Sequence, residues 1–128
     1  MARVIRMPSN GELPPGPVRD FVEFLFQFYR EAHRPPLRVI ARTINQRDDL
    51  AGTASTETIR KMLRGTTIPA HWETVEAVLI ALCELAGVDP QYHATIHGRE
   101  ATWRRHLEDF WHSALDEPEG RHEDPWAT

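Results

Sequence analysis

Prolines and glycines divide the chain into segments that repeat apolar residues at the spacing of an α-helix. Pro17 precedes the first segment, Pro35 and Pro36 separate it from the second, and Gly65 and Gly87 follow the third and fourth. Proline suits the first turn of a helix and glycine the position just after its end, so these residues mark helix boundaries. No strand-like pattern is longer than four residues. The sequence predicts an all-α fold, a compact bundle of about five helices.

The apolar residues place the helices. In the first segment Val18, Phe21, Leu25 and Phe28 recur every three or four residues, and further apolar side chains widen that face beyond what one core contact needs. Helices are expected at 17–33, 37–46, 55–64, 72–86 and 100–115, with a short helical turn at 90–97.

The remaining residues are expected to be irregular. Residues 1–16 hold three prolines and two glycines and are predicted to be a flexible N-terminal arm. Residues 116–128 are acidic, contain proline and lack periodicity, which predicts a disordered tail whose Trp126 has no evident role. Residues 17–115 are expected to form the folded domain, in which a helical extension follows the first four helices.

Charge is distributed unevenly along the chain. The formal net charge is −4, but residues 1–70 carry eleven basic and seven acidic side chains, whereas residues 71–128 carry four basic and twelve acidic ones. The front half is therefore at +4 and the rear half at −8. This division predicts an anion-binding surface in the front half.

Several other classes of protein do not fit the sequence. No apolar run reaches the roughly 18 residues of a membrane span, and the N-terminus lacks a secretory signal, so a cytoplasmic protein without membrane contact is expected. Cys83 is the only cysteine, lies among apolar residues and is expected to be buried. His93 and His97 have the spacing of a metal pair but lack further ligands. No nucleophile motif or phosphate loop occurs, so we expect no enzyme, no metal and no cofactor.

The second and third segments have the features of a helix-turn-helix. Ala41 allows a close helix crossing, Ile44 and Ile59 fill the space between the helices, and Ser55 is a good N-cap. This region resembles the lambda-repressor-like (Xre-type) helix-turn-helix family, especially its small actinobacterial members. The resemblance covers about residues 18–87 and is carried by these matching positions: Ala41, Ile44, Ser55, Ile59, Leu63, Gly65, Pro69, Trp72 and Ala77.

The resemblance has one departure. Ala41 and Ile59 are eighteen positions apart, where the family has about ten, so the turn carries an insertion of roughly eight residues. The insertion either loops out above a preserved helix pair or changes the crossing angle. We expect the first outcome, in which shortening residues 46–54 costs little stability.

The resemblance implies a DNA-reading helix at residues 55–64. Arg60 would bind guanine, Glu57 would accept from cytosine, and Thr56 would meet a thymine methyl or a phosphate. The implied DNA-binding set comprises Thr56, Glu57, Arg60 and Lys61 as base-facing residues and Arg38, Arg42 and Arg64 as phosphate contacts. Arg3 and Arg6 on the predicted arm would be able to reach a minor groove.

Two functions follow from these expectations. The first is a sequence-specific transcriptional regulator that binds double-stranded DNA, as a homodimer joined through surplus aromatic surface. The second is a helix-turn-helix-like module that binds a protein partner of a regulatory complex through its acidic C-terminal half. The basic front half favours DNA, whereas the insertion, the acidic total and Glu57 favour a protein partner.

Overall fold

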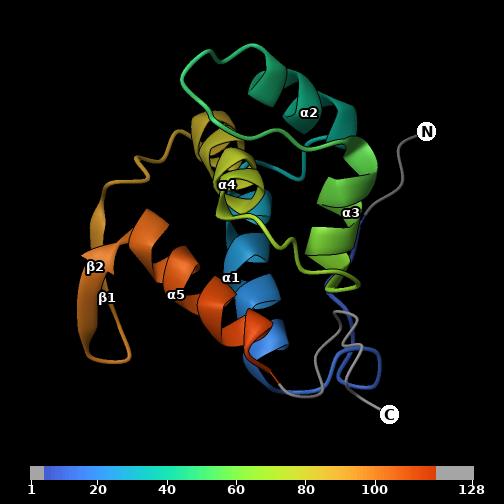
Figure 1. Ribbon diagram of the computed structural model, residues 1–128, viewed down its shortest axis with the longest axis vertical. Helices are drawn as coiled ribbons and strands as arrows, with labels where there is room; N and C mark the ends of the chain where they lie inside the picture. Colours follow the sequence, from blue (N-terminus) through green and yellow to red (C-terminus); the bar gives the residue numbers. More distant parts are fainter. Residues whose placement is uncertain (1–4, 118–128) are drawn as a thin grey trace.

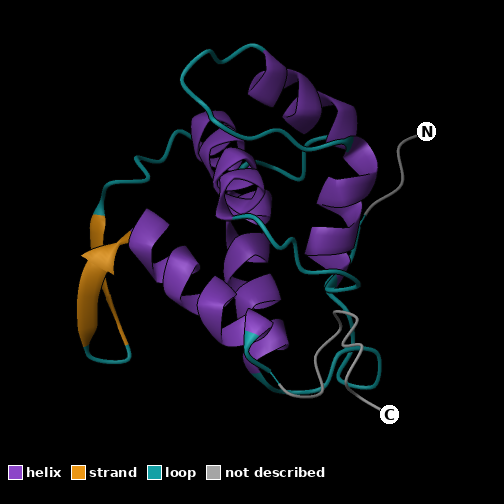
Figure 2. Ribbon diagram, viewed as in Figure 1, coloured by secondary structure: helices purple, strands orange, loops and turns teal. Residues whose placement is uncertain are grey.

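The computed structural model describes residues 5–117, which form five helices and one two-stranded antiparallel sheet. The helices gather around α1 and α4, and the hairpin lies beside the start of α5 (Figures 1 and 2). The elements in chain order are α1 (Pro17–Glu31), α2 (Leu37–Asn45), α3 (Thr56–Arg64), α4 (Trp72–Ala86), β1 (His93–Ile96), β2 (Arg99–Thr102) and α5 (Trp103–Leu115).

The predicted helix boundaries are largely confirmed. Pro17 is the first residue of α1, and α4 has the predicted bounds. The Thr58 backbone N–H donates to Ser55 Oγ at 3.1 Å, so Ser55 caps α3. Gly65 and Gly87 end α3 and α4 in the left-handed conformation, with φ of 70° and 71°. Glycine adopts this conformation without the steric penalty of a Cβ atom.

The prediction of an all-α fold is wrong, because residues 93–102 form a β-hairpin. Its turn is His97–Gly98, with φ of 51° and 79°, and Ile96 pairs with Arg99. Two consecutive positive φ values match the twist of paired strands and favour a two-residue hairpin. The helical turn expected at 90–97 is therefore wrong, because β1 lies there. The last helix, α5, begins at Trp103 and not at residue 100. Each strand has only four residues, too few to show a period of two in the sequence.

Helix α1 is the centre of the core. It contacts α3, α4 and α5, and its buried side chains lie around most of its circumference. The apolar face that looked too wide in the sequence is therefore used by three neighbouring helices.

The surplus aromatic side chains pack within one chain. Phe24 lies against Phe110 with ring centroids 5.1 Å apart, and Phe28 meets Trp103 edge to face at 5.7 Å. Within residues 5–117 the exposed large apolar side chain is Tyr92 alone. The exposed aromatic patch expected to join a homodimer is thus absent from this part of the chain, and the homodimer stays a prediction without that support.

The described part of the N-terminal arm, residues 5–16, packs on the helices without forming one. Leu13 is 2% exposed. Arg19 Nη1 donates to the carbonyls of Pro8 and Leu13 at 3.1 and 2.6 Å. A Cβ atom on Gly65 would lie 2.7 Å from Leu13 Cδ2, so the glycine also gives this segment room to cross the end of α3. The sequence predicted a flexible arm here and gave no indication of these contacts.

The connection between α2 and α3 is a strap along α4. Arg47 Nη1 donates to Glu84 at 2.6 Å near the C-terminal end of α4, and Gly52 abuts the Glu73 backbone at its N-terminal end. Glu73 and Glu84 are about 16 Å apart along the helix, close to the roughly 17 Å that the five residue steps from 47 to 52 cover when extended. Leu50 packs partly into the core. The expectation that residues 46–54 loop out is therefore wrong, because the segment is attached at both ends of α4. Figure 1 shows this connection passing over α4 on its way from α2 to α3.

Replacing Gly52 with alanine tests this attachment. The new Cβ would lie 2.3 Å from the Glu73 carbonyl oxygen, so the strap or α4 must shift. We expect Gly52→Ala to lower the free energy of unfolding by about 1–3 kcal/mol in urea denaturation. Gly11→Ala is the control, because its Cβ would meet nothing closer than 3.9 Å. Equal stability of both variants would show that the strap does not depend on this contact.

Candidate nucleic-acid interface

Helices α2 and α3 pack with their apolar faces inward. Ile40 and Ile44 of α2 are buried, as are Ile59, Met62 and Leu63 of α3. The two helices contact each other, α2 also contacts α4, and α3 also contacts α1. Because the apolar faces pack against the core, the polar faces of α2 and α3 point toward solvent.

The outer face of α2 carries two arginines. Arg38 and Arg42 are one helical turn apart and exposed. Within residues 5–117 neither guanidinium has a hydrogen-bond or ion-pair partner, so both are available to an external anion. Arginine suits this role because its planar fork matches phosphate oxygens.

The first two turns of α3 expose the residues expected to face bases. Thr56, Glu57, Arg60 and Lys61 all lie on the solvent side. Glu57 and Arg60 form an ion pair with each other one turn apart. An exposed pair of this kind contributes about 0–1 kcal/mol, so a strong ligand is able to break it. Lys61 has no ion-pair partner among the described residues.

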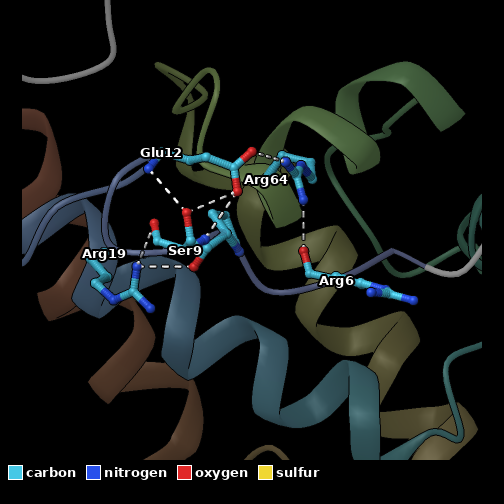
Figure 3. A network of polar contacts seen from close by, with 6 residues as sticks. Arg6, Ser9, Glu12, Arg19 and Arg64 are labelled. Carbon is cyan, nitrogen blue, oxygen red and sulfur yellow. Dashed lines mark hydrogen bonds and ion pairs between the residues drawn. The ribbon is translucent and has the colours of Figure 1, made fainter.

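Arg64 is already engaged by the N-terminal segment. One of its guanidinium nitrogens donates to the Arg6 carbonyl at 2.9 Å, and the other donates to Glu12 Oε2 at 3.0 Å (Figure 3). The structure thus gives Arg64 a role in anchoring residues 6–12 over the end of α3, whereas the sequence predicted a phosphate contact.

Ser9 and Glu12 complete this anchor through mutual hydrogen bonds. The Ser9 backbone N–H donates to Glu12 Oε1 at 3.1 Å, and the Glu12 backbone N–H donates to Ser9 Oγ at 3.3 Å. The bonds from Ser9, followed by the positive charge of Arg64, lower the pKa of the Glu12 carboxyl from its usual value. Glu12 is therefore held as a carboxylate, which favours the ion pair.

Arg6 lies at the edge of this region and Arg3 outside the described residues. The Arg6 side chain is exposed and its carbonyl is bound by Arg64, so it sits beside α3 (Figure 3). Its expected reach into a minor groove stays a prediction.

A groove of about 460 Å³ lies next to the start of α3. Lys61 and His71 contribute to its lining, together with hydroxyl side chains from α3, the strap and the segment before α4. These hydroxyl residues are Thr53, Ser55, Thr58, Thr67 and Thr74. Hydroxyls commonly donate to DNA phosphates. Except for the cap Ser55, the sequence analysis missed these residues, although threonine and serine cluster visibly at 53–58 and 66–67.

The described basic residues without an ion pair come from the first half of the chain. Among residues 5–117, the arginines of the hairpin and α5 all form ion pairs, namely Arg99, Arg104 and Arg105. The basic residues without an ion pair in this range lie, along the chain, between the N-terminal segment and α3: Arg6, Arg30, Arg34, Arg38, Arg42 and Lys61. The charge asymmetry of the sequence thus appears again in which basic residues are paired.

Other types of site have little basis in the described chain. Cys83 is 1% exposed, and burial, followed by the charge of Asp89, raises the pKa of its thiol to about 12. It is therefore protonated at neutral pH and is not activated as a nucleophile. Residues 5–117 contain no group of three or more potential metal ligands. None of the helices described has the length and apolar character needed to cross a bilayer.

Comparisons of the chain with family models, with curated protein sequences and with solved structures gave no match. The resemblance to lambda-repressor-like proteins therefore depends on the residues of α2, α3 and the start of α4 alone.

Replacing Arg64 with methionine tests its anchoring role. The variant keeps the aliphatic stem but loses the donors to Arg6 and Glu12, so the segment 6–12 should open more often. We expect faster amide hydrogen exchange over residues 6–13 by mass spectrometry, with global stability changed by less than about 1 kcal/mol. Arg42→Met is the control and should leave this exchange unchanged. Unaltered exchange in Arg64→Met would contradict the anchoring role.

Proposed function

We propose that this protein binds double-stranded DNA through α2 and the first two turns of α3, and that it acts as a sequence-specific transcriptional regulator in the bacterial cytoplasm. The observation that carries the proposal is the pair of exposed arginines on α2, which have no partner among residues 5–117, on a helix that packs against α3. DNA binding depends strongly on such cations because each phosphate contact releases counterions.

The residues divide into two roles in this proposal. Arg38, Arg42 and Lys61 contact phosphates together with the hydroxyls of the groove and set the orientation of the protein on the duplex. Arg60 reads a base after its pair with Glu57 opens, because its fork can donate twice to guanine. Arg64 stays with the N-terminal segment and positions it beside the duplex.

A protein-interaction module is the second candidate, and one observation favours it. The strap replaces the tight turn that joins the two helices in the family, so the relative placement of α2 and α3 is set by α4. The acidic C-terminal half would then meet a basic partner. Trp126 of the acidic tail lies outside the described residues.

The salt dependence of duplex binding tests the phosphate contacts. Fluorescence anisotropy with a random 30-base-pair duplex should give an affinity that falls steeply as salt rises. Arg38→Met and Arg42→Met should each reduce the slope of log affinity against log salt by about 0.9, because each removes one phosphate contact. Arg105→Met is the matched control, since this exposed arginine of α5 is already paired. Equal slopes for all three variants would place the DNA elsewhere, and absence of salt-dependent binding would refute the proposal.

Removing the carboxylate of Glu57 tests whether α3 faces the duplex. Glu57→Gln eliminates a charge that repels phosphate and frees Arg60, so the affinity for random duplex should rise and its salt slope should increase by up to about 0.9. Glu100→Gln removes the same charge from the hairpin and should have a smaller effect. If the two variants bind random duplex equally, α3 does not approach the phosphates.

A further inference from the structure

A second cavity has no lining residue from α2 or α3. Its volume is about 380 Å³, and it opens between α1, the segment after α4 and the start of α5. Phe28, Val88, Tyr92 and Trp103 supply its apolar walls, and Glu31 and Asp89 supply carboxylates. This volume lies within the range of sites for small organic ligands, which runs from about 300 to 1,000 Å³.

Three aromatic rings meet in this cavity. The Tyr92 ring lies nearly parallel to that of Trp103, with centroids 6.1 Å apart, and Phe28 meets Trp103 edge to face. Tyr92 is 61% exposed, although its backbone is fixed: its N–H donates to the Asp89 carbonyl at 3.0 Å, and its carbonyl accepts from the Trp103 N–H at 3.1 Å. A large aromatic side chain is thus held open to solvent by an ordered backbone.

The two carboxylates give the cavity a negative charge without compensation. Glu31 and Asp89 are exposed, and neither forms an ion pair with any described residue. Asp89 Oδ1 accepts from the Gln91 backbone N–H at 2.9 Å, which orients that carboxylate. Among residues 5–117, no lysine, arginine or histidine lines the cavity. Aromatic faces attract organic cations through the ring quadrupole, and nearby carboxylates add Coulomb attraction.

We propose that this cavity binds a small organic ammonium ion, with the apolar body against Phe28, Tyr92 and Trp103 and the charge beside Asp89 and Glu31. An anion would be repelled by both carboxylates. A neutral apolar ligand would gain nothing from them. The proposal is independent of DNA binding, because none of the cavity residues belongs to α2 or α3.

Choline and its neutral analogue 3,3-dimethylbutan-1-ol provide the direct test. The two molecules have nearly the same shape, but a carbon atom in the alcohol replaces the charged nitrogen of choline. Isothermal titration calorimetry with the full chain should show saturable choline binding at least about two-fold tighter than that of the alcohol, since the alcohol lacks the charge that makes a cation–π contact. Benzyltrimethylammonium, with a larger apolar body, should bind more tightly than choline. No saturable binding of either ammonium ion, or equal binding of choline and the alcohol, would overturn the proposal.

Three variants locate the binding. Asp89→Asn keeps the acceptor for Gln91 but removes the charge, and Tyr92→Leu removes the exposed ring, so each should weaken choline binding by about two- to five-fold. Asp48→Asn removes an exposed carboxylate from the strap and should leave the affinity unchanged. Circular dichroism and the melting temperature confirm that each variant is folded. An equal loss in Asp48→Asn, or no loss in the other two, would show that the ion is not bound in this cavity.

Discussion

The burial of α1 against α3, α4 and α5 is the constraint on which the rest of the structure depends. Helix α1 has too much apolar surface for one neighbour, and its aromatic side chains require several partners. The α5 helix covers Phe24 and Phe28, and α3 and α4 cover other parts of the circumference. Because these partners come from distant parts of the sequence, the helices form one core. The segments that connect the helices must therefore run over the surface of that core.

The strap between α2 and α3 shows how the packing of the core determines the candidate site. It runs from Glu84 to Glu73 along α4, so α3 begins where α4 begins and not directly after α2. Helix α2 packs against α3 and α4, and the hydroxyl groove lies between the start of α3, the strap and the start of α4. Arg64 adds the N-terminal segment to this region. The surface proposed to bind DNA would therefore draw on several segments and would not rest on the geometry of a tight turn.

Most helices could be predicted from the sequence because their ends carry local signals, such as Pro17, Ser55 and Gly65, and their apolar residues recur at helical spacing. The hairpin could not, because its strands are four residues long and a His-Gly turn is a weak signal beside Asn-Gly. Arg38, Arg42, Thr56 and Lys61, which the resemblance implied as DNA contacts, are exposed on α2 and α3, and their contact with DNA stays a prediction. The partners of Arg47 and Arg64 could not be predicted, because Arg47 and Glu84 are separated by 37 positions in the sequence and Arg64 and Arg6 by 58. No local sequence pattern indicates contacts over such separations.

The most direct test of the central claim is to map the DNA contact on the protein surface by nuclear magnetic resonance. Titration of the isotope-labelled chain with a 20-base-pair duplex should shift amide signals of residues 38–42, 55–61 and 67–74 and leave those of the hairpin and α5 nearly unchanged. Shifts concentrated in the hairpin or α5, or no shifts at low salt, would contradict the account.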